Sequence, residues 1–162
     1  MILVILIGVL FVGGLLAWTS ERINPEYPRI ISLLIVLLDI VLMFSLLGGD
    51  SSATWLVDLQ VDWLPRFGIS FHLAADGLTV LLLLLTGFLG VIAIGSAWSE
   101  ITERTGFFYF NLLWTLAGVI GVFTALDLFL FFFFWEVMLI PMYFIIAIWG
   151  HENKNYAAMK FF

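Results

Sequence analysis

Glu136 has the clearest capacity for chemistry in this sequence. It lies near the middle of an apolar stretch that runs from Leu128 to Trp149. Insertion of an acid at mid-membrane costs roughly 2.5–3.5 kcal/mol, so such residues usually face a bundle interior and have a partner or water. Burial favours the neutral carboxyl, whereas a nearby cation favours the carboxylate. A carboxyl held between these two influences can take up and release a proton. The alternative for Glu136 is a protonated side chain that makes one hydrogen bond between helices.

Asp127 and Lys160 are two further candidates for proton transfer. Asp127 precedes Glu136 by nine residues, which at about 100° per residue puts the two acids on opposite helix faces, roughly 13 Å apart. The spacing therefore favours Asp127 as a helix N-cap, with its charge well placed for the helix dipole. Lys160 differs from the other charges near the C-terminus because it enters an apolar segment.

Three other residues keep open roles. Asp39 interrupts the apolar stretch Ile30 to Leu47; it could join a polar axis or pair with a residue outside this chain. Pro141 removes a backbone donor and clashes with the carbonyl four residues earlier, which predicts a kink. His72 falls in an expected β-hairpin and is expected to be a surface residue and not a proton relay.

The composition shows which solvent must surround these residues. Of 162 residues, 64% are hydrophobic and only 11% are charged, against about 25% charged in soluble domains. Six basic residues and a net charge of −6 exclude nucleic-acid binding. The absence of cysteine excludes disulfides and Cys-ligated metals. We therefore expect an all-α polytopic membrane protein.

Five stretches are long and apolar enough to cross a bilayer. They are Ile2–Trp18, Ile30–Leu47, Gly77–Trp98, Phe107–Leu126 and Leu128–Trp149. A sixth apolar segment starts near Ala157 and the sequence ends at Phe162 within it. We expect this chain to be the N-terminal part of a longer polypeptide; the alternative is a short amphipathic helix at the interface.

The basic residues predict the orientation, because they concentrate in cytoplasmic loops. Five of them share one side, namely Arg22, Arg29, Arg104, Lys154 and Lys160, and only Arg66 falls on the other. The N-terminus is therefore expected outside the cytoplasm, with the chain in a bacterial inner membrane.

The long loop before the third span predicts a β-hairpin. Val57–Trp63 and Phe67–Leu73 both alternate apolar and polar residues around a turn that contains Pro65. The hairpin would be extracytoplasmic, and Asp76 is expected to cap the helix that follows it.

Small residues in the third and fourth spans predict close helix packing. They are Gly87, Gly90, Ala93, Ala97, Ala117, Gly118 and Gly121. The aromatic run Phe129–Trp135 is expected to face lipid and neighbouring helices.

Four runs resemble subunit M, an antiporter-like membrane-arm subunit of the proton-pumping NADH:quinone oxidoreductase, respiratory complex I. They are Phe134–Phe144 with Ile148–Gly150, Trp63–Ile69, Asp76–Leu78 and Tyr156–Phe162. The W-E-x-M-L-I-P-M-Y core separates the first run from subunits L and N, and Met159 departs from the usual A-A-T-K-F-F of the last. The resemblance extends from about Trp55 onward; the first 50 residues match only in hydropathy.

The resemblance implies a fourteen-helix subunit with inverted repeats, of which residues 1–162 are a single membrane domain forming the N-terminal third. Glu136 matches the glutamate that pairs in the family with a lysine on a later helix and works in proton translocation. Lys160 and Asp127 match positions of less certain role. The partner lysine falls beyond Phe162.

The function expected is proton translocation coupled to quinone reduction in other subunits. This chain would hold no redox cofactor itself; FMN, iron–sulfur clusters and quinone would lie elsewhere in the complex. Its partners would be lipid and neighbouring antiporter-like membrane-arm subunits. The alternatives are a subunit of a multisubunit cation/proton antiporter or membrane-bound hydrogenase, and a structural membrane subunit without a transport role.

Overall fold

A computed structural model describes residues 1–48 and 54–161 of the chain. Its helices are α1 (Ile2–Ser20), α2 (Tyr27–Phe44), α3 (Gly77–Glu100), α4 (Thr105–Thr124), α5 (Leu128–Trp149) and α6 (Lys154–Phe161), with short 3₁₀ turns at Ser45–Gly48 and Pro65–Phe67. The strands are β1 (Val57–Leu64) and β2 (Ile69–Ala75). Five of these helices are long and apolar enough to span a membrane, so the expected polytopic fold is confirmed.

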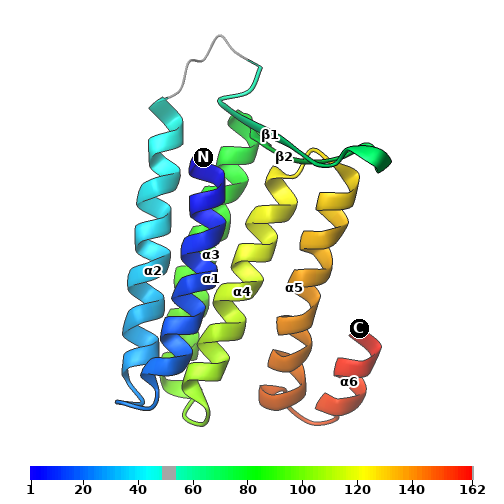
Figure 1. The fold of residues 1–162 in the computed structure, drawn as a ribbon. Helices are drawn as coiled ribbons and strands as arrows, with labels where there is room; N and C mark the ends of the chain where they lie inside the picture. The colour runs from blue at the N-terminus through cyan, green and yellow to red at the C-terminus, as the bar shows by residue number, and fades with distance from the viewer. Residues whose placement is uncertain (49–53, 162) are drawn as a thin grey trace.

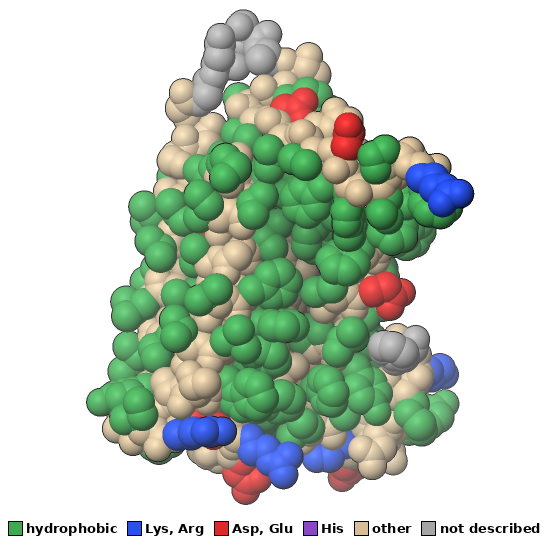
Figure 2. Space-filling view, in the orientation of Figure 1, with side chains coloured by type: hydrophobic (Ala, Val, Ile, Leu, Met, Phe, Trp, Pro, Cys, Tyr) green, Lys and Arg blue, Asp and Glu red, His purple; other side chains and the backbone are tan. Residues whose placement is uncertain are grey.

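The helices form a bundle with an extension on one side. α1 packs against α2 and α4, α2 against α3, and α4 against α5, while α6 contacts α5. Figure 1 shows α1 to α4 gathered together and α5 at the edge, with α6 rising beside the lower part of α5. The surface follows the same division: hydrophobic side chains cover the middle, and most charged side chains lie at the two ends (Figure 2).

The hairpin closes one end of this bundle. β1 and β2 pair antiparallel, with Val57 opposite Ala75 and Val61 opposite Phe71. Gly68 sits between the strands with a φ of 68°, a left-handed conformation that costs glycine little. The hairpin crosses the ends of α3, α4 and α5 (Figure 1). The expected hairpin is confirmed, whereas its extracytoplasmic position stays a prediction.

Several helix boundaries differ from the sequence prediction by two to three residues, and three of them have a clear cause or consequence. α2 starts at Tyr27 because Pro28 occupies its first turn, where a missing N–H is tolerated. α4 ends at Thr124, two residues early, because Leu126 donates its N–H to the carbonyl of His72 on β2 at 3.0 Å. α6 starts at Lys154 rather than near Ala157. Of the predicted sixth segment, Phe162 lies outside the described residues.

Candidate functional site

Glu136 lies on the face of α5 that points away from the bundle. The positions of α5 that are buried are Leu130, Phe134 and Pro141. They recur at helical spacing, and Phe134 packs against Gly121 of α4. Glu136 follows Phe134 by two residues, or roughly 200° around the helix, and its side chain is exposed. Within the described part of the chain it makes no hydrogen bond or ion pair. The carboxyl is therefore presented outward from the five-helix unit.

Glycines on α4 fix the position of α5. A Cβ added at Gly118 would lie 2.8 Å from Met138 Cβ and 3.0 Å from its Cα. A Cβ at Gly121 would lie 2.3 Å from the ring of Phe134. Real side chains do not tolerate such distances, so α5 packs this closely only because both positions lack a side chain. The predicted role of these small residues in close packing is confirmed here, and also at Gly87 and Gly90, where a Cβ would lie within 3 Å of Ile40 and Leu116.

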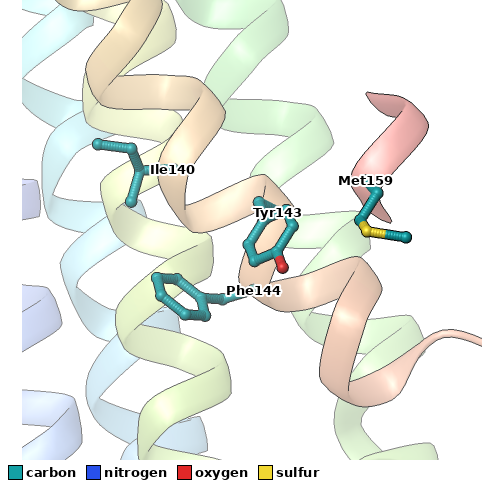
Figure 3. A pocket seen from close by; sticks show the side chains of 4 residues that line it. All are labelled: Ile140, Tyr143, Phe144 and Met159. Atoms are coloured by element: carbon teal, nitrogen blue, oxygen red, sulfur yellow. The ribbon is translucent and has the colours of Figure 1, made fainter. Parts of the chain in front are cut away.

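A groove lies beside α5 and α6, further along α5 than Glu136. It has a volume of about 590 Å³ and is lined by Ile140, Tyr143 and Phe144 of α5 and by Met159 of α6. Figure 3 shows Tyr143 on the part of α5 nearer to Met159 of α6, with Ile140 and Phe144 further from α6. Ile140 and Tyr143 follow Glu136 by four and seven residues, so they share its helix face. Two residues that line this apolar groove, one of them a phenol, thus share the helix face of the Glu136 carboxyl.

Tyr143 was not singled out by the sequence, although its spacing could have revealed it. An i+7 position repeats the helix face of residue i, and seven residues correspond to roughly 10 Å of rise. The hydroxyl group of Tyr143 is polar within an otherwise apolar groove. A pattern of charged residues alone does not include this side chain.

Pro141 is buried within α5 without ending it. The helix runs unbroken from Leu128 to Trp149, and the kink expected at Pro141 stays a prediction.

Asp127 caps α5 and also binds the hairpin. Its Oδ1 accepts hydrogen bonds from the backbone N–H groups of Phe129 at 2.8 Å and Leu130 at 3.3 Å. Its Oδ2 accepts from Ser70 N on β2 at 3.0 Å, with Ser70 Oγ at 3.4 Å. The expected N-cap is confirmed, and the tie to Ser70 is an addition that sequence spacing could not reveal. The backbone hydrogen bond from Ser70 contributes most to holding the pKa of Asp127 below its usual range.

This arrangement predicts an acid-sensitive contribution of Asp127 to stability. A carboxyl whose pKa is lowered on folding stabilises the fold above its unfolded pKa, about 3.9. That contribution is lost as the pH falls through the lower, folded value. We expect Asp127→Ala to lower the thermal unfolding temperature at pH 7 and to have progressively less effect below about pH 4.

The control for this prediction is Asp62→Ala, which removes an exposed acid from β1. Unfolding of both variants is followed by circular dichroism over pH. An unchanged unfolding temperature for Asp127→Ala at pH 7 would contradict the capping role.

The hairpin contributes other contacts of its own. His72 Nε2 lies 2.8 Å from Asp58 Oδ1, and both side chains are partly exposed, as expected of a surface histidine. Trp63 packs edge-on against Phe129 and Phe133 of α5, with ring centroids 5.9 and 6.2 Å apart. The phenylalanine run therefore serves both the surface and the hairpin contact.

Asp76 caps α3 as expected. Its Oδ1 accepts from Thr79 N and Thr79 Oγ1, both at 2.7 Å, and these bonds lower the pKa of the Asp76 carboxyl, the backbone bond most. The cap orients α3 where it leaves the hairpin.

The three sequence-predicted site residues do not meet. Lys160 is exposed on α6, with its ammonium 5.7 Å from the ring centroid of Tyr156. Asp127 lies at the hairpin end of α5, and Glu136 lies nine residues further along. In the described ranges, no contact joins these three groups. Asp39 is separate again, buried in α2 within the bundle.

Comparison with known proteins defines the class first. The family model described as NADH:quinone oxidoreductase/Mrp antiporter, TM, matches residues 125–162. A chain of respiratory complex I from Thermus thermophilus with bound NADH has a TM-score of 0.81 at 23% identity, covering 98% of this chain and 31% of that one. A chain of the Mrp complex from Dietzia sp. has a TM-score of 0.81 at 15% identity, covering 99% of this chain and 17% of that one. The fold is that of the membrane subunits of such complexes.

Sequence similarity points to one subunit within this class of complexes. NADH-quinone oxidoreductase subunit M from Escherichia coli K12 is 49% identical over 175 residues, which cover 100% of this chain and 34% of the relative. The same subunit from Pseudomonas aeruginosa is 49% identical over 179 residues, with 100% and 35% covered. The expected resemblance to subunit M is confirmed, and it extends over the first 50 residues, beyond the part that the sequence motifs covered. The chain spans about a third of the length of these curated relatives.

Proposed function

We propose that this chain is the N-terminal third of a fourteen-helix, proton-translocating membrane subunit of an NADH:quinone oxidoreductase. The observation that carries the proposal is the carboxyl of Glu136, exposed halfway along α5 on the face that the described helices leave open. Similarity to subunit M supports the choice of complex. The subunit would lie in a bacterial inner membrane with its N-terminus and hairpin outside the cytoplasm.

Glu136 is the proton-carrying group in this proposal. A carboxyl at mid-membrane is neutral unless a cation lies near it. The open face of α5 offers space for such a cation on a later helix of the full subunit, as the family resemblance implies. Approach of the cation favours release of the proton, and its withdrawal favours uptake. Protonation of Glu136 would thereby follow the position of its partner.

The other two candidates have different roles in this proposal. Both oxygens of Asp127 accept hydrogen bonds from the backbone, so we assign it to positioning α5 and not to carrying protons. Lys160 is exposed on α6. It is a candidate for proton transfer from this chain to the later helices of the full-length subunit.

The redox chemistry of the complex would lie in other subunits. FMN, iron–sulfur clusters and quinone would be bound there, and quinone reduction would drive the changes around Glu136. Neighbouring antiporter-like membrane-arm subunits and lipid would cover the apolar outer faces of the helices.

Copurification tests the choice of complex. The full-length subunit, tagged and extracted in mild detergent, should bring with it peripheral subunits that contain flavin and iron–sulfur clusters. Vesicles that hold the complex should acidify on addition of NADH. Recovery of membrane subunits alone, with cation/proton exchange and no NADH oxidation, would instead identify the multisubunit antiporter. The similarity of the fold to a chain of the Mrp complex is the reason to test this alternative.

A further inference from the structure

A carboxyl without a hydrogen-bond partner lies inside the bundle of α1 to α4. Asp39, on α2, is only 2% exposed, and its Oδ1 accepts no hydrogen bond from the described residues. It belongs to the buried face of α2 together with Ser32, Val36 and Met43. Buried polar atoms in native proteins are nearly always paired, so an unpaired one requires an explanation.

The surroundings of Asp39 contain nothing that would stabilise a negative charge. The side chains around it come from all four helices and are Leu10, Val36, Met43, Thr86, Gly87, Leu116 and Ile120. None of them is titratable, and only Thr86 has a polar side chain. An isolated buried carboxylate in such surroundings is so costly that the group neutralises instead.

The hydroxyl of Thr86 is already committed as a donor. Its Oγ1 donates to the carbonyl of Leu82 at 2.8 Å. A hydroxyl has one hydrogen and two lone pairs, so toward Asp39 this oxygen acts only as an acceptor. An acceptor suits a protonated carboxyl, which has an O–H to donate, and repels a carboxylate.

The space beside Asp39 also decides what can neutralise it. The cavity leaves no room for a water-sized molecule, and a bridging water needs such room together with several polar partners. A bound metal cation needs several oxygen ligands, whereas the described lining has only the side-chain oxygens of Asp39 and Thr86. A proton is the remaining counter-charge that fits.

We propose that Asp39 is a second proton-binding carboxyl of this chain, held as the neutral acid within the α1–α4 bundle. It differs from Glu136 in its surroundings, because Glu136 is exposed on α5 whereas Asp39 is enclosed on every side by helices. Exchange of its proton requires those helices to separate enough to admit water. The inference goes beyond the proposed pumping role of Glu136 and does not depend on it.

Infrared spectroscopy of the assembled complex in lipid tests this assignment. The spectrum of the wild type minus that of Asp39→Asn, at pH 7, should contain the C=O stretch of one protonated carboxylic acid. Ser32→Ala removes another unpaired polar atom from the same face of α2 and should leave that band in place. If the difference instead contains carboxylate stretches, Asp39 is ionised and the proposal is wrong.

A second variant keeps the aspartate and removes the one other polar side chain that lines the same space, Thr86. In Thr86→Val the band should remain, because the surroundings become still less able to stabilise a carboxylate. Replacement of the band by carboxylate stretches would overturn the assignment. Transfer to D2O should shift the wild-type band more slowly than backbone exchange occurs in the hairpin, and an immediate shift would overturn the claim that the bundle encloses Asp39. The band is expected even if Glu136 has no part in pumping, so the two proposals can fail separately.

Discussion

Replacement of Glu136 by glutamine should abolish most NADH-driven proton pumping while the complex still assembles. Glutamine keeps the size and polarity of the side chain but cannot carry a proton. A positioned proton-transfer group contributes about 100-fold or more to rate, and we expect at least a fall of about that size in pumping. The exposed position of Glu136, without partners in the described chain, means that few packing contacts change.

The measurement is NADH-driven acidification of inverted vesicles, with the amount of assembled complex determined in parallel. The matched control is Glu152→Gln, which changes an exposed acid in the turn between α5 and α6; it should pump normally. Glu136→Leu distinguishes the purely structural alternative, under which it would be tolerated. Normal pumping by Glu136→Gln would contradict the proposed function.

A single methyl group at Gly121 should strongly destabilise the packing of α5. The added Cβ would lie 2.3 Å from the ring of Phe134, at atoms near the root of that side chain, which cannot swing away. Overpacking of this kind typically costs about 1–3 kcal/mol. Displacement of α5 would also move Glu136, so Gly121→Ala should lower both the unfolding temperature and the pumping rate.

Gly95→Ala is the control, because no atom lies within 4 Å of the Cβ position there. Alanine should leave stability unchanged or raise it by about 0.5–1 kcal/mol, since glycine is unfavourable within a helix. The double variant Gly121→Ala/Phe134→Ala should lose less stability than the sum of the losses in the two single variants. Such non-additivity is expected for residues in contact. Strict additivity in thermal unfolding would contradict the predicted clash.

The sequence sufficed for the helices and the hairpin because both signals are local. Long apolar stretches and strict alternation are read within one segment, and Asp76 and Asp127 lie immediately before the helices that they cap. Boundaries were less predictable where a distant segment decides them. α4 ends at Thr124 because Leu126 pairs with His72 on β2, a contact between residues far apart in sequence.

The candidate site shows the same division. The position of Glu136 within an apolar stretch placed it near the middle of a helix. It could not show that Glu136 faces away from α4, because that depends on how closely Gly118 and Gly121 accept α5. Residue spacing along one helix does not predict tertiary contacts. It therefore could not reveal the interaction of Asp127 with Ser70 or the enclosure of Asp39.

The double use of Asp127 has a mechanical consequence. One oxygen holds the first turn of α5 and the other holds β2, so a single carboxylate joins the hairpin to α5. An α-helix is stiff along its axis, and nine residues separate this joint from Glu136. A displacement of the hairpin would therefore also move the first turn of α5, and with it the position of Glu136 along the helix axis.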